Sequence, residues 1–247
     1  MALQNHLREL SSMYSTVIQY VDDILLASET EEQHEQDLRT LLDHLHQEGH
    51  KASIDKAQIT QGEVVYLGQK ISKGKRELTQ DRTAAIRAAK QPTTIQELRS
   101  FLGLCNFNRN WIDSYTQLAQ PLTDFLKGKQ ASKVSVTLTK EEKEAFENLK
   151  RALCSVPALG IPDNGKPYTL LGHEKEGYMT AILTQEHGDK QRPIGYYSKK
   201  LDTVALGWGS CLRAMEATCQ AVMATAGLVL DQKLTLSVRT QSILCYP

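Results

Sequence analysis

Several features that would assign this chain to a common class of protein are missing from its sequence. The longest apolar run, Ala221–Leu230, has about half of the roughly 20 residues that a membrane-spanning helix needs. The first residues include Arg8 and Glu9 and contain no apolar stretch like that of a secretory signal. We therefore expect no membrane partner and no export.

Paired cysteines are also lacking. The five cysteines are odd in number and scattered, with no Cys-x-x-Cys pair; they are Cys105, Cys154, Cys211, Cys219 and Cys245. This usage favours reduced thiols in an intracellular, cytoplasmic protein over a disulfide framework. Cys211 and Cys219 lie eight residues apart in an expected helix and are predicted to pack in the core.

The chain carries no net charge, because 29 Lys and Arg balance 29 Asp and Glu among its 247 residues. Its 40% apolar content is enough for a core and excludes a disordered chain. The charges are unevenly spread: residues 1–50 hold ten acidic and two basic side chains, and residues 51–100 hold ten basic and five acidic ones. Such a basic block can attract phosphates, but it is equally typical of an ordinary solvated surface.

The residue pattern predicts an α+β fold. β-Favouring residues on both sides of Asp22-Asp23 predict a hairpin over residues 16–28, and leucines at helical spacing predict a helix over 30–48. Residues 63–71 are strand-like, and the Lys73-Gly74-Lys75 segment predicts a turn into a further strand.

A helical region follows, with a helix over 81–90 and predicted capping boxes at Thr94 and Thr139, each with Glu three residues later. Residues 128–135 are the best linker candidate. After Pro157 the pattern predicts three strands, a long helix and a last strand, at 168–171, 178–185, 193–197, 211–226 and 233–238.

Two adjacent carboxylates on a hairpin turn have a specific chemical use. They can hold Mg²⁺, which prefers oxygen ligands, and two such ions can clamp the attacking and leaving oxygens of a phosphoryl transfer. An Asp-Asp pair is also an ordinary polar turn, because Asp is a favoured turn residue. The pair alone does not decide between these interpretations.

The surrounding residues favour the first interpretation. The segment Gln19–Ala27, QYVDDILLA, resembles the Tyr-X-Asp-Asp hairpin of retroviral reverse transcriptases. The resemblance continues in the family's order over roughly residues 3–240, through KAQI at 56–59, VYLG at 65–68, LRSFLG at 98–103, WI at 111–112, PALG at 157–160, RPI at 192–194 and YSKKLD at 197–202. The chain is similar to the gammaretroviral, murine-leukaemia type of polymerase, from an endogenous retroelement.

The resemblance implies that Asp22 and Asp23 are catalytic and bind Mg²⁺. It also implies that the fingers and a third metal-binding aspartate are missing here, since Glu9 is the only acid among the 21 residues before Asp22. We therefore expect the metal site to be incomplete and independent polymerase activity to be absent.

The resemblance further implies contact with nucleic acid, as a primer–template duplex or an RNA–DNA hybrid. Six residues are implied, three in a primer-gripping hairpin and three on a thumb helix: Tyr66, Leu67, Gly68, Gly103, Asn106 and Arg109. Basic residues within 51–56 and 70–76, including Lys73 and Arg76, are expected to add a basic trough. A competing interpretation is that the thumb packs Phe101 and Phe107 against the following domain and presents nothing to nucleic acid.

The last part of the chain resembles a ribonuclease H fold without its catalytic acids. His173 and Gln241 stand where active relatives have carboxylates, and only Glu216, on the long helix, offers one. A single acid cannot assemble a two-metal site, so we expect no ribonuclease H activity.

We therefore expect three units: a partial polymerase palm over 1–74, a helical thumb over 75–158 and a ribonuclease-H-like connection domain over 159–247. The first hypothesis is a fragment of a retroviral-type RNA-directed DNA polymerase, inactive alone. The alternatives are a non-catalytic nucleic-acid-binding or protein-interaction module and a translated fragment without function. The sequence leaves the oligomeric state open.

Overall fold

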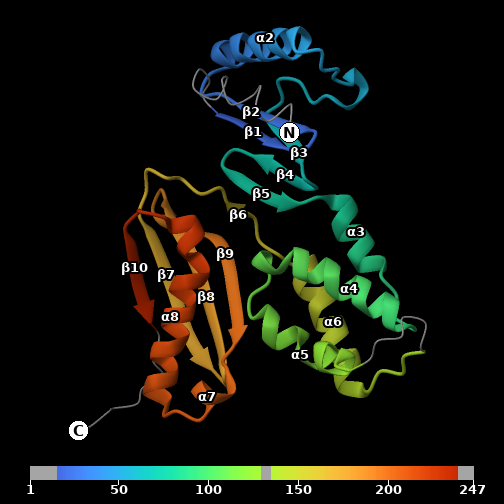
Figure 1. Ribbon diagram of the computed structural model, residues 1–247, viewed down its shortest axis with the longest axis vertical. Coiled ribbons are helices and arrows are strands. Elements are labelled where there is room, and N and C mark those ends of the chain that lie inside the picture. Colours follow the sequence, from blue (N-terminus) through green and yellow to red (C-terminus); the bar gives the residue numbers. More distant parts are fainter. Residues whose placement is uncertain (1–15, 129–134, 239–247) are drawn as a thin grey trace. The chain divides into compact units, whose positions relative to one another are not determined.

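The computed structural model describes residues 16–128 and 135–238, and the chain divides into two compact units, Met1–Lys73 and Gly74–Pro247. Unit 1 begins with an antiparallel hairpin, β1 (Thr16–Tyr20) and β2 (Asp23–Ala27), followed by helix α2 (Glu31–Gln47). A short 3₁₀ turn, η1 (Ile54–Lys56), leads to strands β3 (Glu63–Tyr66) and β4 (Gln69–Ser72). Figure 1 shows this order in blue and teal.

Helix α2 begins where the sequence predicts, because the Thr30 hydroxyl accepts a hydrogen bond from the Gln33 N–H and caps the helix. Its apolar stripe buries Leu41 and Leu45 against Ile24 and Leu26 of β2. The helix therefore supports the strand that follows the acidic pair.

The strand-like residues 63–71 form a hairpin, as the resemblance implies, because a tight turn divides them into β3 and β4. Leu67 and Gly68 have φ angles of +50° and +71°, and two successive positive φ angles are the mark of a type I′ hairpin turn. Glycine adopts such angles freely, whereas leucine rarely does, so apolar patterning gave no sign of the turn at Leu67.

The first half of unit 2 is mainly helical. Strand β5 (Lys75–Leu78) pairs antiparallel with the short β6 (Leu159–Gly160), and between them lie α3 (Gln80–Ala88), α4 (Ile95–Phe107), η2 (Arg109–Trp111), α5 (Tyr115–Leu126) and α6 (Lys140–Cys154). The predicted capping box at Thr139 and Glu142 is confirmed. At Thr94 only half of it forms, because the Glu97 carboxylate accepts from Thr93 instead.

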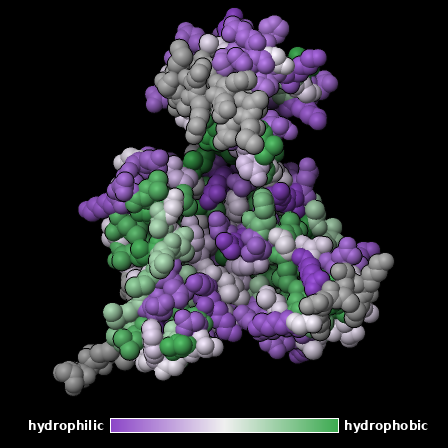
Figure 2. Space-filling model, in the orientation of Figure 1, coloured by the Kyte–Doolittle hydropathy of each residue, from purple (hydrophilic) through white to green (hydrophobic). Residues whose placement is uncertain are grey.

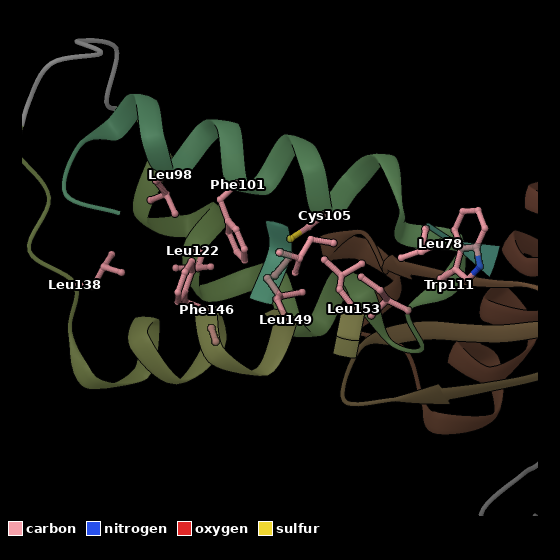
Figure 3. Packing of buried hydrophobic residues seen from close by; sticks show 14 of the residues in the cluster. Leu78, Leu98, Phe101, Cys105, Trp111, Leu122, Leu138, Phe146, Leu149 and Leu153 are labelled. Carbon is pink, nitrogen blue, oxygen red and sulfur yellow. The ribbon is translucent and has the colours of Figure 1, made fainter. Parts of the chain in front are cut away.

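The helices enclose one apolar core. Figure 3 shows Phe101 of α4 and Phe146 of α6 among the residues of this core. Their ring centroids are 4.4 Å apart. Leu98, Leu122 and Leu149, from three helices, are fully buried around them. Phe101 therefore packs within the helical core, and the competing interpretation that it packs against the following domain is wrong.

The second half of unit 2 is a four-stranded sheet in the order β10-β7-β8-β9. Strands β7 (Tyr168–Lys175), β8 (Tyr178–His187) and β9 (Lys190–Lys200) form an antiparallel meander, and β10 (Leu234–Val238) joins β7 in parallel. The short α7 (Thr203–Leu206) and the long α8 (Ser210–Val229) connect β9 to β10, and α8 packs on the sheet (Figure 1). The predicted strand–strand–strand–helix–strand order is confirmed.

Helix α8 meets the sheet through small side chains. Its buried residues are Ala217, Ala221, Thr225 and Val229, which recur every four residues. Cys211 and Cys219 are exposed, so the prediction that they pack in the core is wrong. Larger apolar side chains also point outward, and Figure 2 shows hydrophobic surface over this part of unit 2; the exposed set on α8 includes Leu212, Met215 and Met223.

Strand β9 joins the two halves of unit 2. Ile194 is an extra residue in its ladder with β8, because Leu183 pairs with Gly195 and Thr184 with Pro193. The Ile194 carbonyl accepts a 2.7 Å hydrogen bond from Nη2 of Arg76, whose guanidinium also lies 5.1 Å from the Trp111 ring centroid. Arg76 therefore satisfies a carbonyl at a β-bulge and links β5, η2 and β9.

No helix within the described ranges is long and apolar enough to cross a bilayer.

Candidate metal and nucleic-acid sites

The acidic pair lies at the tip of the β1–β2 hairpin. Tyr20 pairs with Asp23, so Val21 and Asp22 form the two-residue turn and Asp23 begins β2. Val21 has a φ of +52°, which is unusual for any residue except glycine and especially for a β-branched one. Strained backbone of this kind persists where the surrounding structure fixes it and is frequent at functional sites. Both aspartates are exposed and can take up a ligand from solvent.

A groove of about 500 Å³ in unit 1 brings predicted residues together. Asp22, Asp23, Tyr66 and Leu67 all line it, and so does the basic residue Lys51. The Tyr66 hydroxyl lies 3.5 Å from the Ile18 carbonyl of β1. Burial, together with the charge of Asp23, raises the pKa of Tyr66. The primer-gripping hairpin expected from sequence therefore borders the same groove as the acidic pair.

A segment between η1 and β3 is tied to the edge of β3. The Gln58 side chain accepts a 2.7 Å hydrogen bond from the Val65 N–H and donates a 2.8 Å bond to the Val65 carbonyl. These bonds replace those of a neighbouring strand, so Gln58 fixes the wall of the groove that carries Lys56.

A third acid, Asp37, does not join the pair. It is only 2% exposed on α2, and its carboxylate accepts 2.7 Å hydrogen bonds from the Ser28 hydroxyl and the Gln33 amide. In the sequence, Asp37 is one of the ten acids of the first fifty residues, and nothing there marks it as buried. Its neighbour Ser28 follows β2, so Asp37 holds the end of the strand that begins with Asp23.

The acidic pair suits Mg²⁺ in its chemistry, because both ligands are carboxylates and Mg²⁺ is often held by one or two carboxylates plus substrate phosphates. Among residues 16–128 and 135–238, no group of three His, Cys, Asp or Glu side chains is placed to hold a metal ion. The pair therefore offers two carboxylate ligands, and a metal ion held there would need further oxygen ligands.

The predicted thumb residues lie in unit 2, on α4 and on the η2 turn that follows it. Gly103 and Asn106 are exposed on the helix, and Arg109 is exposed in η2. A Cβ atom added to Gly103 would meet nothing within 4 Å. Phe107 is 61% exposed, with the Arg82 guanidinium 5.1 Å from its ring centroid, so the competing interpretation that Phe107 packs against the following domain is wrong.

The predicted basic trough loses one of its members. Arg76 is partly buried, and its guanidinium is engaged with the Ile194 carbonyl and Trp111, so it is unavailable for a phosphate. Burial also lowers its pKa. Lys73 is exposed, whereas Lys70 forms a 2.9 Å ion pair with Glu63.

The ribonuclease-H-like sheet has an imidazole at the expected acid position. His173 is on β7, beside Gly172, which pairs with Val238 of β10. Its ring nitrogens lie 3.0 and 3.2 Å from the Thr180 hydroxyl. A cavity of about 350 Å³ there is also lined by Asp113, an acid from the loop before α5 that sequence reasoning missed because it is distant along the chain. The Glu216 carboxylate accepts from the Gln220 amide on α8, and Gln241 lies outside the described residues.

Comparison with known proteins gives two family matches. Residues 1–71 match the family described as reverse transcriptase (RNA-dependent DNA polymerase), and residues 138–236 match the RNase H-like domain found in reverse transcriptase. Foamy viral protease-reverse transcriptase has the same fold, with a TM-score of 0.85 and 24% identity over 97% of this chain and 42% of that one.

Both matched families are parts of reverse transcriptases, and the fold is shared with one. The chain is similar to gammaretroviral Pol sequences: it is 45% identical over 221 residues to the Gag-Pol polyprotein of baboon endogenous virus, and 46% identical over 223 residues to the Pol polyprotein of feline endogenous virus ECE1. Each match covers 90% of this chain, which spans 13% and 21% of the two relatives.

Proposed function

We propose that the chain supplies part of an RNA-directed DNA polymerase, namely the metal-binding hairpin, the thumb and the connection domain. The observation that carries the proposal is the position of Asp22 and Asp23 at a strained hairpin tip, beside a groove that Tyr66 and Leu67 also line. The similarity to gammaretroviral Pol sequences over nine-tenths of the chain supports it. The partner would be a primer–template duplex or an RNA–DNA hybrid.

Asp22 and Asp23 would hold Mg²⁺, with water and substrate phosphates as the remaining ligands. When bound, the metal would supply a positive charge that stabilises the oxygens of a transferring phosphoryl group. The strained turn at Val21 fixes the backbone that carries both carboxylates, and Asp37 fixes the far end of β2.

Two carboxylates are too few to preorganise a two-metal site, so the 247-residue chain alone should not extend a primer. The loss of a preorganised charge-stabilising group lowers rates by about 10² to 10³-fold or more. The assay is extension of a primed RNA template with Mg²⁺ or Mn²⁺. Extension that disappears in the Asp22→Asn/Asp23→Asn variant would show that the chain is a polymerase by itself.

A second candidate function is duplex binding without catalysis, and the open face of α4 favours it. Gly103→Ala separates binding from folding. An alanine should stabilise the helix by about 0.5–1 kcal/mol, because the added methyl meets nothing in the protein. If a nucleic-acid backbone approaches Gly103 closely, the same methyl should weaken duplex binding about fivefold to 100-fold.

The matched control is Gly227→Ala on α8, where an added Cβ also meets nothing within 4 Å. Fluorescence anisotropy with a labelled primer–template duplex should show tight binding for this control at low salt. Affinity should fall with a log–log slope of about −0.9 for each phosphate that the protein neutralises. Equal binding by the Gly103→Ala and Gly227→Ala variants would exclude the α4 face as the duplex surface.

We also infer that the ribonuclease-H-like domain does not cleave RNA–DNA hybrids. His173 offers a nitrogen ligand where an anionic oxygen is needed, and Glu216 is engaged with Gln220. Hybrid cleavage above the level of a Glu216→Gln variant would contradict this inference.

A further inference from the structure

A further pocket lies in unit 2, at the end of the sheet where β8 turns into β9. The cavity measures about 410 Å³, and its lining includes Gly160, Asp163, Lys166, Gln185, His187 and Arg192. None of these residues belongs to the predicted metal or nucleic-acid site.

The loop that forms one wall of this pocket is held rigidly by Gln185. The Gln185 side chain is only 4% exposed. Its carbonyl oxygen accepts a 2.9 Å hydrogen bond from the Asp163 N–H. Its amide donates bonds of 2.8 and 3.0 Å to the carbonyls of Asp163 and Lys166. One buried amide thus fixes the loop that carries Lys166, so the wall is preorganised.

The Arg192 side chain lies against the backbone of Gly160, in space that a side chain at residue 160 would fill. A Cβ atom at Gly160 would lie 3.1 Å from Cδ and 3.3 Å from Cγ of Arg192, and 2.8 Å from Cδ1 of Ile194. The β-bulge at Ile194, two residues further along β9, breaks the ladder beside it. Within the described part of the chain, no carboxylate pairs with the Arg192 guanidinium.

The pocket lining holds two cations, Arg192 and Lys166, and two acids, Asp163 and Glu186, and a third cation, Lys75, lies outside the lining but near it. Lys75 of β5 pairs in register with Gly160. The positive charges of Lys75, Arg192 and Lys166 all act on the His187 imidazole. Burial and these three cations lower the pKa of His187. Of the two acids in the lining, Asp163 is engaged by the Lys166 ammonium at 3.2 Å and the Gly165 N–H, and Glu186 is exposed.

We propose that this pocket binds a phosphate group, held by the Arg192 guanidinium and flanked by Lys75, Lys166 and His187. A planar guanidinium donates two parallel hydrogen bonds to phosphate oxygens, which suits an unpaired arginine in a preformed hollow. The phosphate would come either from a nucleic-acid backbone or from a free phosphorylated molecule. The proposal does not rest on the α4 face or on the acidic pair.

The first test uses inorganic phosphate and the NMR signals of His187, assigned with a His187→Gln variant, at constant ionic strength against chloride. Saturable shifts should appear, and the pKa of His187 should rise because the anion offsets the neighbouring cations. Arg192→Gln should weaken phosphate binding about five- to tenfold or more, since it removes charge-assisted hydrogen bonds. Lys199→Gln, which removes an exposed charge from the other end of β9, is the matched control and should have no effect.

A second variant keeps the test decisive if Arg192→Gln disturbs β9. Lys75→Gln removes an exposed cation from β5 and should weaken phosphate binding by a smaller factor, about two- to threefold. The absence of saturable phosphate shifts, or equal affinities for the Arg192→Gln and Lys199→Gln variants, would overturn the proposal.

The source of the phosphate is decided by duplex anisotropy with the same variants. If the nucleic-acid backbone supplies it, Arg192→Gln should weaken duplex binding and Lys199→Gln should not. If only inorganic phosphate binding is affected, the ligand is a free phosphorylated molecule. Gly103→Ala should leave phosphate binding unchanged, so failure of the α4 interface and failure of this pocket are distinguishable.

Discussion

Arg76 offers a direct measure of what joins the two halves of unit 2. Its Nη2 donates a 2.7 Å hydrogen bond to the carbonyl of Ile194, the bulge residue of β9, and its guanidinium lies over Trp111. Replacement by methionine keeps most of the aliphatic stem and removes the charge, and replacement by alanine removes both. The two variants therefore separate the contributions of the charge and of the stem.

The expected loss of stability follows from these contacts. A hydrogen bond from a charged donor contributes about 1.5–3 kcal/mol, and a partly buried cation–π contact contributes about 0.5–2 kcal/mol. Part of this loss is offset, because the variant no longer pays the free energy of removing the Arg76 charge from water. We expect Arg76→Met to destabilise unit 2 by about 1–3 kcal/mol, and Arg76→Ala by about 1 kcal/mol more, because the stem packing is also lost.

Tryptophan fluorescence can follow unit 2 alone. The chain has two tryptophans, Trp111 and Trp208, and both are in unit 2. In a Trp208→Phe background, urea unfolding monitored at the buried Trp111 reports this unit without a contribution from unit 1. Arg87→Met is the matched control, since Arg87 is an exposed arginine in the last turn of α3.

The reasoning would be refuted if Arg76→Met and Arg87→Met shift the urea midpoint equally. A stabilising effect of Arg76→Met would show that desolvation of the guanidinium exceeds all its contacts. Equal losses for Arg76→Met and Arg76→Ala would show that the stem contributes nothing.

Three further outcomes are expected. Val21→Gly should stabilise unit 1 by up to about 1 kcal/mol, because the strain of a valine at positive φ exceeds the extra conformational entropy that a glycine loses on folding. A lower urea midpoint, followed by circular dichroism, would contradict this. Asp37→Ala should destabilise unit 1 by about 1–3 kcal/mol, because Ser28 and Gln33 lose a buried acceptor, whereas no change in amide exchange on α2 would refute the role. Burial raises the pKa of Cys105 to about 12, so the native state keeps this thiol protonated. The stability that the raised pKa gives the native state is therefore lost as the pH rises from about 9 toward 12. A thiol reagent at pH 8 should modify the exposed Cys211 and Cys219 first, and equally fast labelling of Cys105 would oppose this.

The sequence predicts the hairpin around the acidic pair, helix α2 and the order of elements in the ribonuclease-H-like sheet. These features depend on local patterns: β-favouring residues flank Asp22 and Asp23, and leucines recur at helical spacing before Gly49. The Tyr-X-Asp-Asp resemblance added the positions of the two acids and of the hairpin at Tyr66.

Other features depend on partners that are distant along the chain. Arg76 belongs to a basic stretch in sequence, but its acceptor is a bulge carbonyl 118 residues away, which no local pattern reveals. Likewise, the face of α8 that packs on the sheet is the one whose side chains let the helix approach closely. Small residues such as Ala217 and Ala221 permit that approach, and Cys219 is left in solvent.

The two units differ greatly in the size of their cores. Among the described residues of unit 1, the buried apolar side chains are Leu41 and Leu45, whereas unit 2 contains two extended clusters. Segments with few buried apolar contacts open most often, and proteases degrade chains from their opened states. In a cell, the half-life of this polypeptide should therefore depend on how often unit 1 opens, and a ligand in the groove beside Asp22 and Asp23 would lengthen it.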